Sequence, residues 1–162
     1  MTTATTTRRH AADIARFRKG ASKLRAGVAG LSKKQLHTRC APGAWSIHEI
    51  VVHMVDTDLA ARHRMRQIVA QDSPLLMGYD HNAMIDRLDS KVLDTAKLLD
   101  LFELHREITA AWLESLPAKA FARAGIHSQY GKFTLGEILA MYAGHVDHHD
   151  KFVKGKRKTL KA

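Results

Sequence analysis

The sequence predicts an all-α protein, a four-helix bundle formed by a single domain. Four segments carry apolar residues three or four positions apart, the spacing that places them on one face of a helix. The three prolines, at positions 42, 74 and 117, fall between these segments. No stretch shows the sustained alternation that is typical of a strand. A chain of 162 residues is long enough to bury a core as one domain.

Two of the expected helices have clear start signals. Ser46 and Glu49 have the three-residue spacing of a capping box, and so do Thr134 and Glu137. In this motif the first side chain accepts a hydrogen bond from the backbone amide of the second residue, whose side chain reaches back to the first. We expect the helix after Ser46 to end near residue 71 and the helix after Thr134 to end near residue 154.

The other two helices are predicted from the periodicity of their apolar residues. One is expected at about residues 10–29 and the other at about 91–115, where Pro117 would stop it. The segment 121–133 is expected to be irregular, and a long connection should follow the second helix. These connections of unequal length fit a bundle with one or more crossovers.

The positive charge of the chain lies at its ends. The net charge is +10, but residues 1–40 contribute +9 and residues 150–162 contribute +5, so the body between them is acidic at −4. We expect flexible basic ends at about 1–9 and 154–162. The body lacks the basic stripe interleaved with aromatic residues that a nucleic-acid platform uses, which argues against a nucleic-acid partner.

Three further features indicate a cytoplasmic protein. Cys40 is the only cysteine, so no intramolecular disulfide can form and a reducing compartment fits. No apolar run approaches the roughly 20 residues that span a membrane. The basic N-terminus is not followed by an apolar segment, as a signal peptide would be.

A cluster of histidines near the end of the chain raises the question of a metal site. A helix advances about 100° per residue, so His145 and His149 share the apolar side of the fourth helix, whereas His148 faces outward. Two imidazoles four residues apart can share one metal ion. The chain has eleven histidines, however, so a pair with this spacing can also arise by chance.

A third histidine could complete the site. His53 borders the apolar face of the second helix, seven residues after Ser46, and His145 lies eleven residues after Thr134. If the starts of these two helices are level, the histidines lie near one layer of the bundle. His105 competes for a role, since it lies within the apolar face of the third helix: it is either a hydrogen-bonded core histidine or a further group at the metal.

These residues resemble the motifs of a known family. The stretch PGAWSIHEIVVHMVDTD, with Trp45, Ser46 and His53, resembles the second-helix motif of the DinB/YfiT-like superfamily. The stretch GKFTLGEILAMYAGHVDHHDKFV, with His145 and His149, resembles its last-helix motif. YDHNAM matches its connection more loosely. The resemblance covers roughly residues 31–153.

The resemblance implies a four-helix bundle, often a homodimer, with a divalent metal ion (nickel, zinc or iron) on His53, His145 and His149. Related branches act on low-molecular-weight thiols such as mycothiol, bacillithiol or glutathione. Three neutral histidines leave coordination positions open for a water or a thiol. We therefore expect a metal-dependent enzyme of the thiol S-transferase or hydrolase type. The alternative is a non-catalytic, dimeric metal-binding bundle with a role in stress.

Other side chains are expected around the metal. Asp56 and Glu49 both lie within one turn of His53 and could orient its ring. Glu49 could instead serve only the capping box, and Asp56 could face water. The residues expected to support the site or to line a pocket beside it are Asp56, Trp45, Tyr79, His105, His127 and Tyr142.

Overall fold

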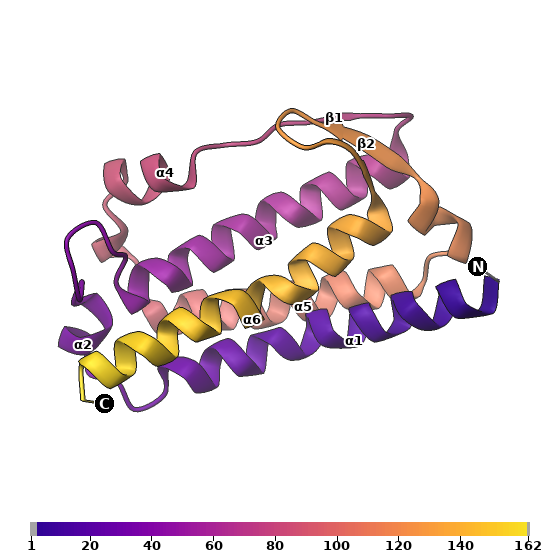
Figure 1. Cartoon of the computed structure of the whole chain (residues 1–162). Helices are drawn as coiled ribbons and strands as arrows, with labels where there is room; N and C mark the ends of the chain where they lie inside the picture. Colours follow the sequence, from indigo (N-terminus) through magenta and orange to yellow (C-terminus); the bar gives the residue numbers. More distant parts are fainter. Residues whose placement is uncertain (1–2, 162) are drawn as a thin grey trace.

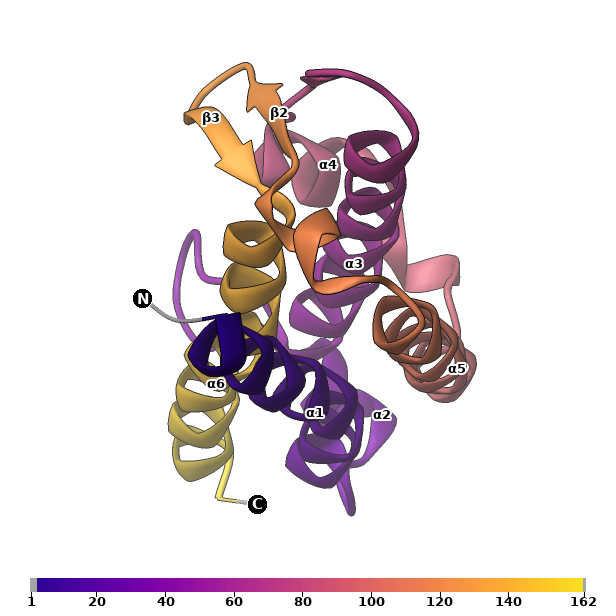
Figure 2. The ribbon, with the colours of Figure 1, turned by 90° about the vertical axis from the view of Figure 1, so that its right-hand side faces the viewer.

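The computed structural model describes residues 3–161, which form a bundle of four long helices with short elements at its surface (Figure 1). The long helices are α1 (Thr3–Val28), α3 (Ile47–Ala70), α5 (Thr95–Glu114) and α6 (Leu135–Thr159). Helices α1 and α3 each pack against both α5 and α6, so they occupy opposite corners of the bundle (Figure 2). The predicted all-α four-helix bundle is confirmed.

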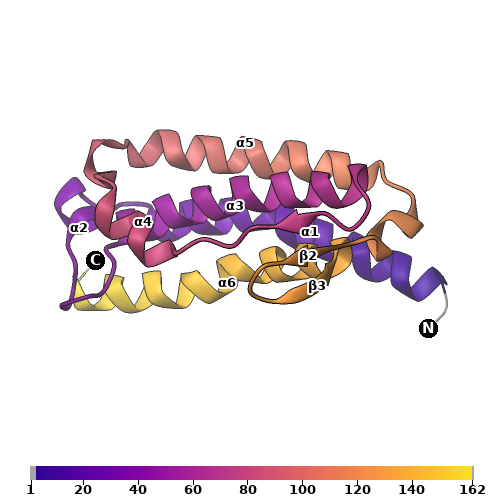
Figure 3. The same cartoon turned by 90° about the horizontal axis from the view of Figure 1, so that it is seen from above.

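The helices do not simply alternate in direction. In Figure 1, α1 and α6 run from right to left, whereas α3 and α5 run from left to right. A long connection must therefore return from the end of α3 to the level of its start. This connection contains β1 (Leu75–Leu76), α4 (His81–Arg87) and η1 (Ser90–Val92). Seen from above, it lies over the region between α3 and α6 (Figure 3).

A small sheet joins this connection to the segment before α6. Strand β1 pairs in parallel with β2 (Ala124–His127), which pairs antiparallel with β3 (Gly131–Thr134). The expectation that 121–133 is irregular is therefore wrong for most of that segment. Strands of two to four residues are too short to show a period in the sequence. The remaining short elements are α2 (Lys33–His37) and η2 (Ala118–Ala122).

Both predicted capping boxes are formed, but two helices are longer than expected. Helix α1 begins at Thr3, and α6 continues to Thr159. The end of α6 is held by Arg157, which donates hydrogen bonds to the backbone oxygens of Gly27 at 3.0 Å and Ala29 at 2.8 Å. The expected flexible ends are thus helical over 3–9 and 154–159, and residues 1, 2 and 162 lie outside the described part. No helix of residues 3–161 is both long and apolar enough to cross a membrane.

The interior consists of two apolar clusters separated by a polar layer. On α3, one cluster ends at Val55 and the other begins at Ala61. Asp58 lies between them and pairs with Arg106 of α5, and neither side chain is exposed to solvent. This polar layer crosses the bundle at Asp58, five residues after His53 on the same helix.

Candidate metal centre

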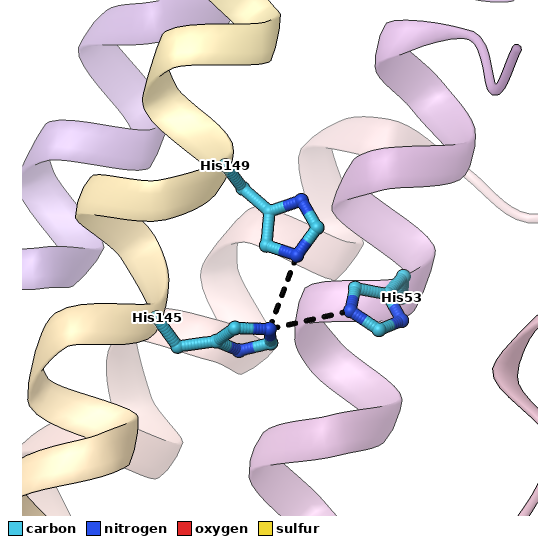
Figure 4. Close-up of side chains that lie close together, drawn as sticks. All are labelled: His53, His145 and His149. Atoms are coloured by element: carbon cyan, nitrogen blue, oxygen red, sulfur yellow. Dashed lines mark hydrogen bonds between the residues drawn. The ribbon is translucent and has the colours of Figure 1, made fainter.

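Three histidine side chains converge between α3 and α6 (Figure 4). The Nε2 atom of His145 lies 3.4 Å from Nε2 of His53 and 3.1 Å from Nε2 of His149. One nitrogen from each ring lies within 4.8 Å of the others. His145 and His149 project from the same side of α6, whereas His148 is exposed, as the helical period predicts. The structure thus brings together the three residues that the sequence proposes as metal ligands.

The direction of the helices explains how these residues meet. Helices α3 and α6 run in opposite directions, so their starts lie at opposite ends of the bundle (Figure 1). The assumption that the two starts are level is therefore wrong. His53, in the first third of α3, instead meets His145 and His149, which lie on either side of the middle of α6.

Burial keeps all three rings neutral. Desolvation, together with the smaller effect of neighbouring histidines, lowers the pKa of His53 to about 3, that of His145 to about 3 and that of His149 to about 4. At neutral pH each ring therefore carries one N–H group and one free lone pair. Neutral imidazoles are the form in which histidine binds a metal.

The cluster cannot satisfy its own hydrogen-bonding groups. The Nε2 atom of His145 faces two other Nε2 atoms, although a neutral ring nitrogen can make only one such bond. The Nδ1 atoms of His145 and His149 are buried without a partner. Buried polar atoms are rarely left in this state without a functional reason. The three convergent Nε2 atoms therefore cannot all be satisfied by one another, and two Nδ1 atoms have no partner within residues 3–161.

A divalent metal ion fits this position. Two nitrogens bound at zinc-type distances with a tetrahedral angle lie about 3.3 Å apart. The two shortest separations, 3.1 Å and 3.4 Å, bracket that value. In each ring the lone pair of Nε2 would then bind the metal, and the proton of the neutral ring would be on Nδ1. His53, His145 and His149 are thus the residues that could hold a metal.

Aromatic side chains surround the three histidines. The ring of Trp45 lies 4.9 Å from that of His53, and the ring of Tyr142 lies 5.8 Å from that of His145. Tyr79 approaches indirectly, since its ring packs at 4.4 Å on His81. His81 in turn lies 5.0 Å from His53. Of the residues expected to line a pocket, Tyr79, His127 and Tyr142 line one cavity near the cluster and Trp45 lines another, and their role stays a prediction.

His81 is not among the site residues predicted from the sequence, although its ring contacts that of His53. It is the first residue of α4, and the Asp80 side chain caps that helix through the amide of Ala83 at 3.0 Å. The stretch YDHNAM thus contained the signal, an aspartate able to cap a helix directly before a histidine. What the sequence could not show is that the connection folds back over α3.

The acidic residues near His53 do not orient its ring. Asp56 is half-buried, and burial raises its pKa, but within residues 3–161 it makes no hydrogen bond to His53. Glu49 serves the capping box, and its carboxylate also accepts two or more bonds from Arg39 at 2.7–3.1 Å. Burial alone would raise the pKa of Glu49, but Arg39 and the Ser46 amide hold it below its usual value.

His105 lies in the core, away from the ring contacts of the cluster. Its Nδ1 is 3.9 Å from a carboxylate oxygen of Asp58, and neither ring nitrogen has a hydrogen-bond partner. Burial lowers its pKa to about 4. The structure therefore places His105 beside the polar layer, as a core histidine that lacks the expected hydrogen bond.

Two cavities flank the histidine cluster. One, of about 150 Å³, borders His145. The other, of about 310 Å³, borders His149 and is closed partly by Trp45 and Phe152, with Lys156 at its wall. A molecule could therefore approach the cluster from either side. The first cavity is lined by polar and aromatic residues that include Thr57, Arg64, Tyr79, His81, His127 and Tyr142.

The sequence was compared with models of known protein families. The model of the DinB superfamily matches residues 16–153, which is most of the chain and includes all three histidines. The chain belongs to the DinB superfamily. This confirms the resemblance that the two histidine motifs indicate.

Relatives and a solved structure agree with this assignment. A protein of Bacillus licheniformis, named as a candidate metal-dependent hydrolase, is 29% identical over 85% of this chain and 78% of its own length. YfiT of Bacillus subtilis, named in the same way, is 30% identical over 79% of this chain and 72% of its own length. The solved structure of YfiT, described as a four-helix bundle of unusual topology, superposes with a TM-score of 0.87. That superposition has 24% identity over 94% of this chain and 87% of YfiT, and it supports the fold.

Proposed function

We propose that this member of the DinB superfamily is a divalent-metal-dependent enzyme with its metal on His53, His145 and His149. The observation that carries the proposal is the convergence of three neutral, buried Nε2 atoms beside a cavity. A histidine cluster that served only to fill the core would have no need of unpaired lone pairs or of an adjacent cavity. The relatives named as candidate metal-dependent hydrolases support the same direction.

In this proposal the three histidines would bind the metal, and the aromatic residues around them would line the space for the substrate. A divalent ion held by three histidines supplies a Lewis acid, which acidifies a water or thiol ligand and polarises a substrate carbonyl. The rigid helices α3 and α6 fix the three imidazoles before any ligand arrives. Trp45 and Phe152 line the cavity on the His149 side and would present apolar surface to a bound molecule. On the other side, Tyr142 presents its hydroxyl to the cavity that borders His145.

The nucleophile that we propose is a water or a low-molecular-weight thiol. The names of the relatives favour hydrolysis, and therefore water. The two separate cavities, one bordering His145 and the other His149, favour a transfer between two bound molecules, one of which is a thiol such as bacillithiol, mycothiol or glutathione. We propose a cytoplasmic location, where such thiols are kept reduced. Nickel, zinc and iron are the candidate metals, since neutral imidazoles suit all three.

Elemental analysis of the purified protein tests the metal site. We expect about one equivalent of divalent metal per chain in the wild type, and its loss in His53→Ala and in His149→Ala. His148→Ala is the matched control, because His148 is exposed on the same helix, one residue before His149. The site is disproved if wild-type protein incubated with nickel, zinc or ferrous iron remains metal-free, or if His53→Ala retains a full equivalent.

The alternative, a non-catalytic metal-binding bundle, differs in whether the metal can accept another ligand. Cobalt(II) substitution makes this visible, since its absorption spectrum changes with the ligands. Addition of glutathione or azide should alter the spectrum if the metal keeps an exchangeable position, as an enzyme requires. A spectrum that neither compound changes would favour the non-catalytic bundle.

A further inference from the structure

One buried cation near the metal centre lacks a counter-charge. Arg64 of α3 is only 8% exposed. It donates to the backbone oxygen of Met77 and, at 3.3 Å, to the hydroxyl of Tyr142. These bonds use two of the five N–H groups that an arginine carries. Within residues 3–161 Arg64 forms no salt bridge, and the buried carboxylate of Asp58, six residues earlier on α3, is already paired with Arg106.

The cavity beside Arg64 is rich in hydrogen-bond donors. The Tyr142 hydroxyl accepts a bond from Arg64, so its own proton is free to be donated. The Nδ1 atom of His127 accepts the backbone amide of Gln129 at 3.2 Å, which places the proton of the neutral ring on Nε2. The hydroxyl of Tyr79 is buried and has no partner. These three residues and Arg64 line the same cavity of about 150 Å³.

The same cavity contains no acidic side chain among the described residues that line it. A buried positive charge is costly unless an anion or several acceptors compensate for it. Here one cation and three free donors face a small space without a carboxylate. The chemistry of the walls is therefore complementary to an anion with several acceptor oxygens. An arginine matches such an anion well, since its planar N–H groups can bind two oxygens at once.

A purely structural role would not require this arrangement. The bond to Met77 fixes the connection after α3, but a lysine or a glutamine could make the same single bond. A structural role for the Arg64–Met77 bond explains neither the unpartnered Tyr79 hydroxyl nor the absence of acidic residues among the described residues that line the cavity. An anion bound in the cavity would account for all of these features together.

We propose that this cavity binds an oxyanion group of the substrate, a carboxylate or a phosphate, with Arg64 as its main ligand. Tyr142, Tyr79 and His127 would add hydrogen bonds to its oxygens. The inference rests on the proposed function, because His145 borders the same cavity and links it to the metal centre. The small volume limits the distance between the anionic group and the reacting atom to a few bonds. The substrate class is thus a compact anion rather than a neutral or cationic molecule.

Nuclear magnetic resonance of the full-length, metal-free protein tests the site directly. Arginine Nε–Hε signals are recorded during titration with acetate, inorganic phosphate and the neutral acetamide. We expect acetate or phosphate to shift the Arg64 signal in a saturable way, with an affinity on the order of millimolar for such small probes. Acetamide should leave the signal unchanged. The anion with the higher affinity identifies the group as a carboxylate or a phosphate.

Substitutions on the same helix provide the controls. Arg64→Gln should weaken binding of the preferred anion by at least about tenfold, whereas Arg64→Lys should retain part of it because the charge remains. Arg66→Gln is the matched control, since Arg66 is exposed two residues away and lies over the ring of Trp112. It should bind the anion as the wild type does. Thermal unfolding of each variant checks that it is folded.

Two results would overturn the inference. One is an Arg64 signal that neither anion shifts in the wild type, which needs no variant to interpret. The other is equal anion binding by wild type and folded Arg64→Gln. Elemental analysis of the same protein after incubation with nickel, zinc or ferrous iron keeps the two proposals apart. Anion binding without metal uptake would refute the metal enzyme alone, and metal uptake without anion binding would refute the anion site alone.

Discussion

The bundle buries two polar groups of residues between its long helices, and they differ in whether their hydrogen bonds are complete. In the polar layer, Arg106 donates to both carboxylate oxygens of Asp58 at 2.5 and 2.9 Å. It also donates to the backbone oxygens of Phe17 and Tyr142 at 2.7 and 3.1 Å. The histidine cluster, by contrast, contains ring nitrogens that face one another or face nothing.

The two groups lie close together in the sequence as well as in space. Asp58 follows His53 by five residues on α3, and Arg106 binds the backbone of Tyr142, three residues before His145. The ring centres of Phe17 and Phe102 lie 4.2 and 4.5 Å from the guanidinium carbon of Arg106. The planar guanidinium group therefore also makes cation–π contacts with both rings. The same helices thus provide one polar group complete in itself and another that requires a ligand. Complete hydrogen bonding therefore distinguishes the Asp58–Arg106 pair from the histidine cluster, whereas His105 beside that pair also has unpaired ring nitrogens within the described residues.

The largest expected effect comes from breaking the complete group. Asp58→Asn removes the negative charge and leaves the guanidinium of Arg106 buried without a counter-ion. We expect the free energy of unfolding to fall by about 3–5 kcal/mol, as for other buried pairs that lose one partner. Urea-induced unfolding measures this change. Asp147→Asn is the control, because Asp147 pairs with Arg16 and Lys23 on the exposed surface and should cost far less. A loss below about 1 kcal/mol for Asp58→Asn would contradict the structural role.

An intermediate effect is expected from protonation of the incomplete group in metal-free protein. The pKa values of His53 and His145 are about 3 and that of His149 is about 4, whereas unfolded histidine titrates near 6.5. Between these values the unfolded chain binds protons that the native cluster does not. The free energy of unfolding is therefore highest above about pH 6.5 and decreases as the pH falls toward 4.

A variant isolates the contribution of one ring to this pH dependence. In His145→Leu the slope should be shallower by one proton, or about 1.4 kcal/mol per pH unit, and the stability near pH 7 should be largely kept. Urea unfolding of wild type and variant at pH 7, 6 and 5 measures both quantities. His105 should contribute equally to the two proteins, since its pKa of about 4 belongs to the polar layer. Parallel stability curves would show that His145 is not buried in neutral form.

The sequence predicted those parts of the fold that depend on local patterns. Periodic apolar residues identified the long helices, and the spacing of Ser46 with Glu49 and of Thr134 with Glu137 located two helix starts. The period of 100° also separated His148 from its two neighbours correctly. These features depend on residues within one or two turns of each other. They can be read without knowledge of the tertiary structure.

The remaining features depend on contacts between distant segments. The direction of α6 relative to α3, the short strands and the approach of His81 to His53 all follow from the path of the connections. His48 is likewise fully buried, and its hydrogen-bond partners at 2.8 Å, Ser90 and Thr95, come from a segment more than 40 residues away in the sequence. The ligand role of the three histidines, the thiol and the homodimer stay predictions.

The smallest expected effect concerns the caps of α3 and α6, the two helices that carry the histidine cluster. Both caps have the two reciprocal hydrogen bonds of a capping box, but Ser46 is 2% exposed, whereas Thr134 is only partly buried beside an exposed Glu137. Thr134→Ala should lower the free energy of unfolding by about 1 kcal/mol, and Ser46→Ala by up to about 2 kcal/mol, because buried amides lose their acceptor.

Urea unfolding of the two cap variants measures this difference, and elemental analysis measures their metal content. Both should keep the metal content of the wild type, since the nearest ligand lies seven residues after Ser46 and eleven after Thr134. Loss of metal in either variant would mean that the position of the histidines depends on the helix ends. Retention would show that the packing between α3 and α6 alone positions the incomplete polar group, just as the neighbouring Asp58–Arg106 pair is held by contacts inside the bundle.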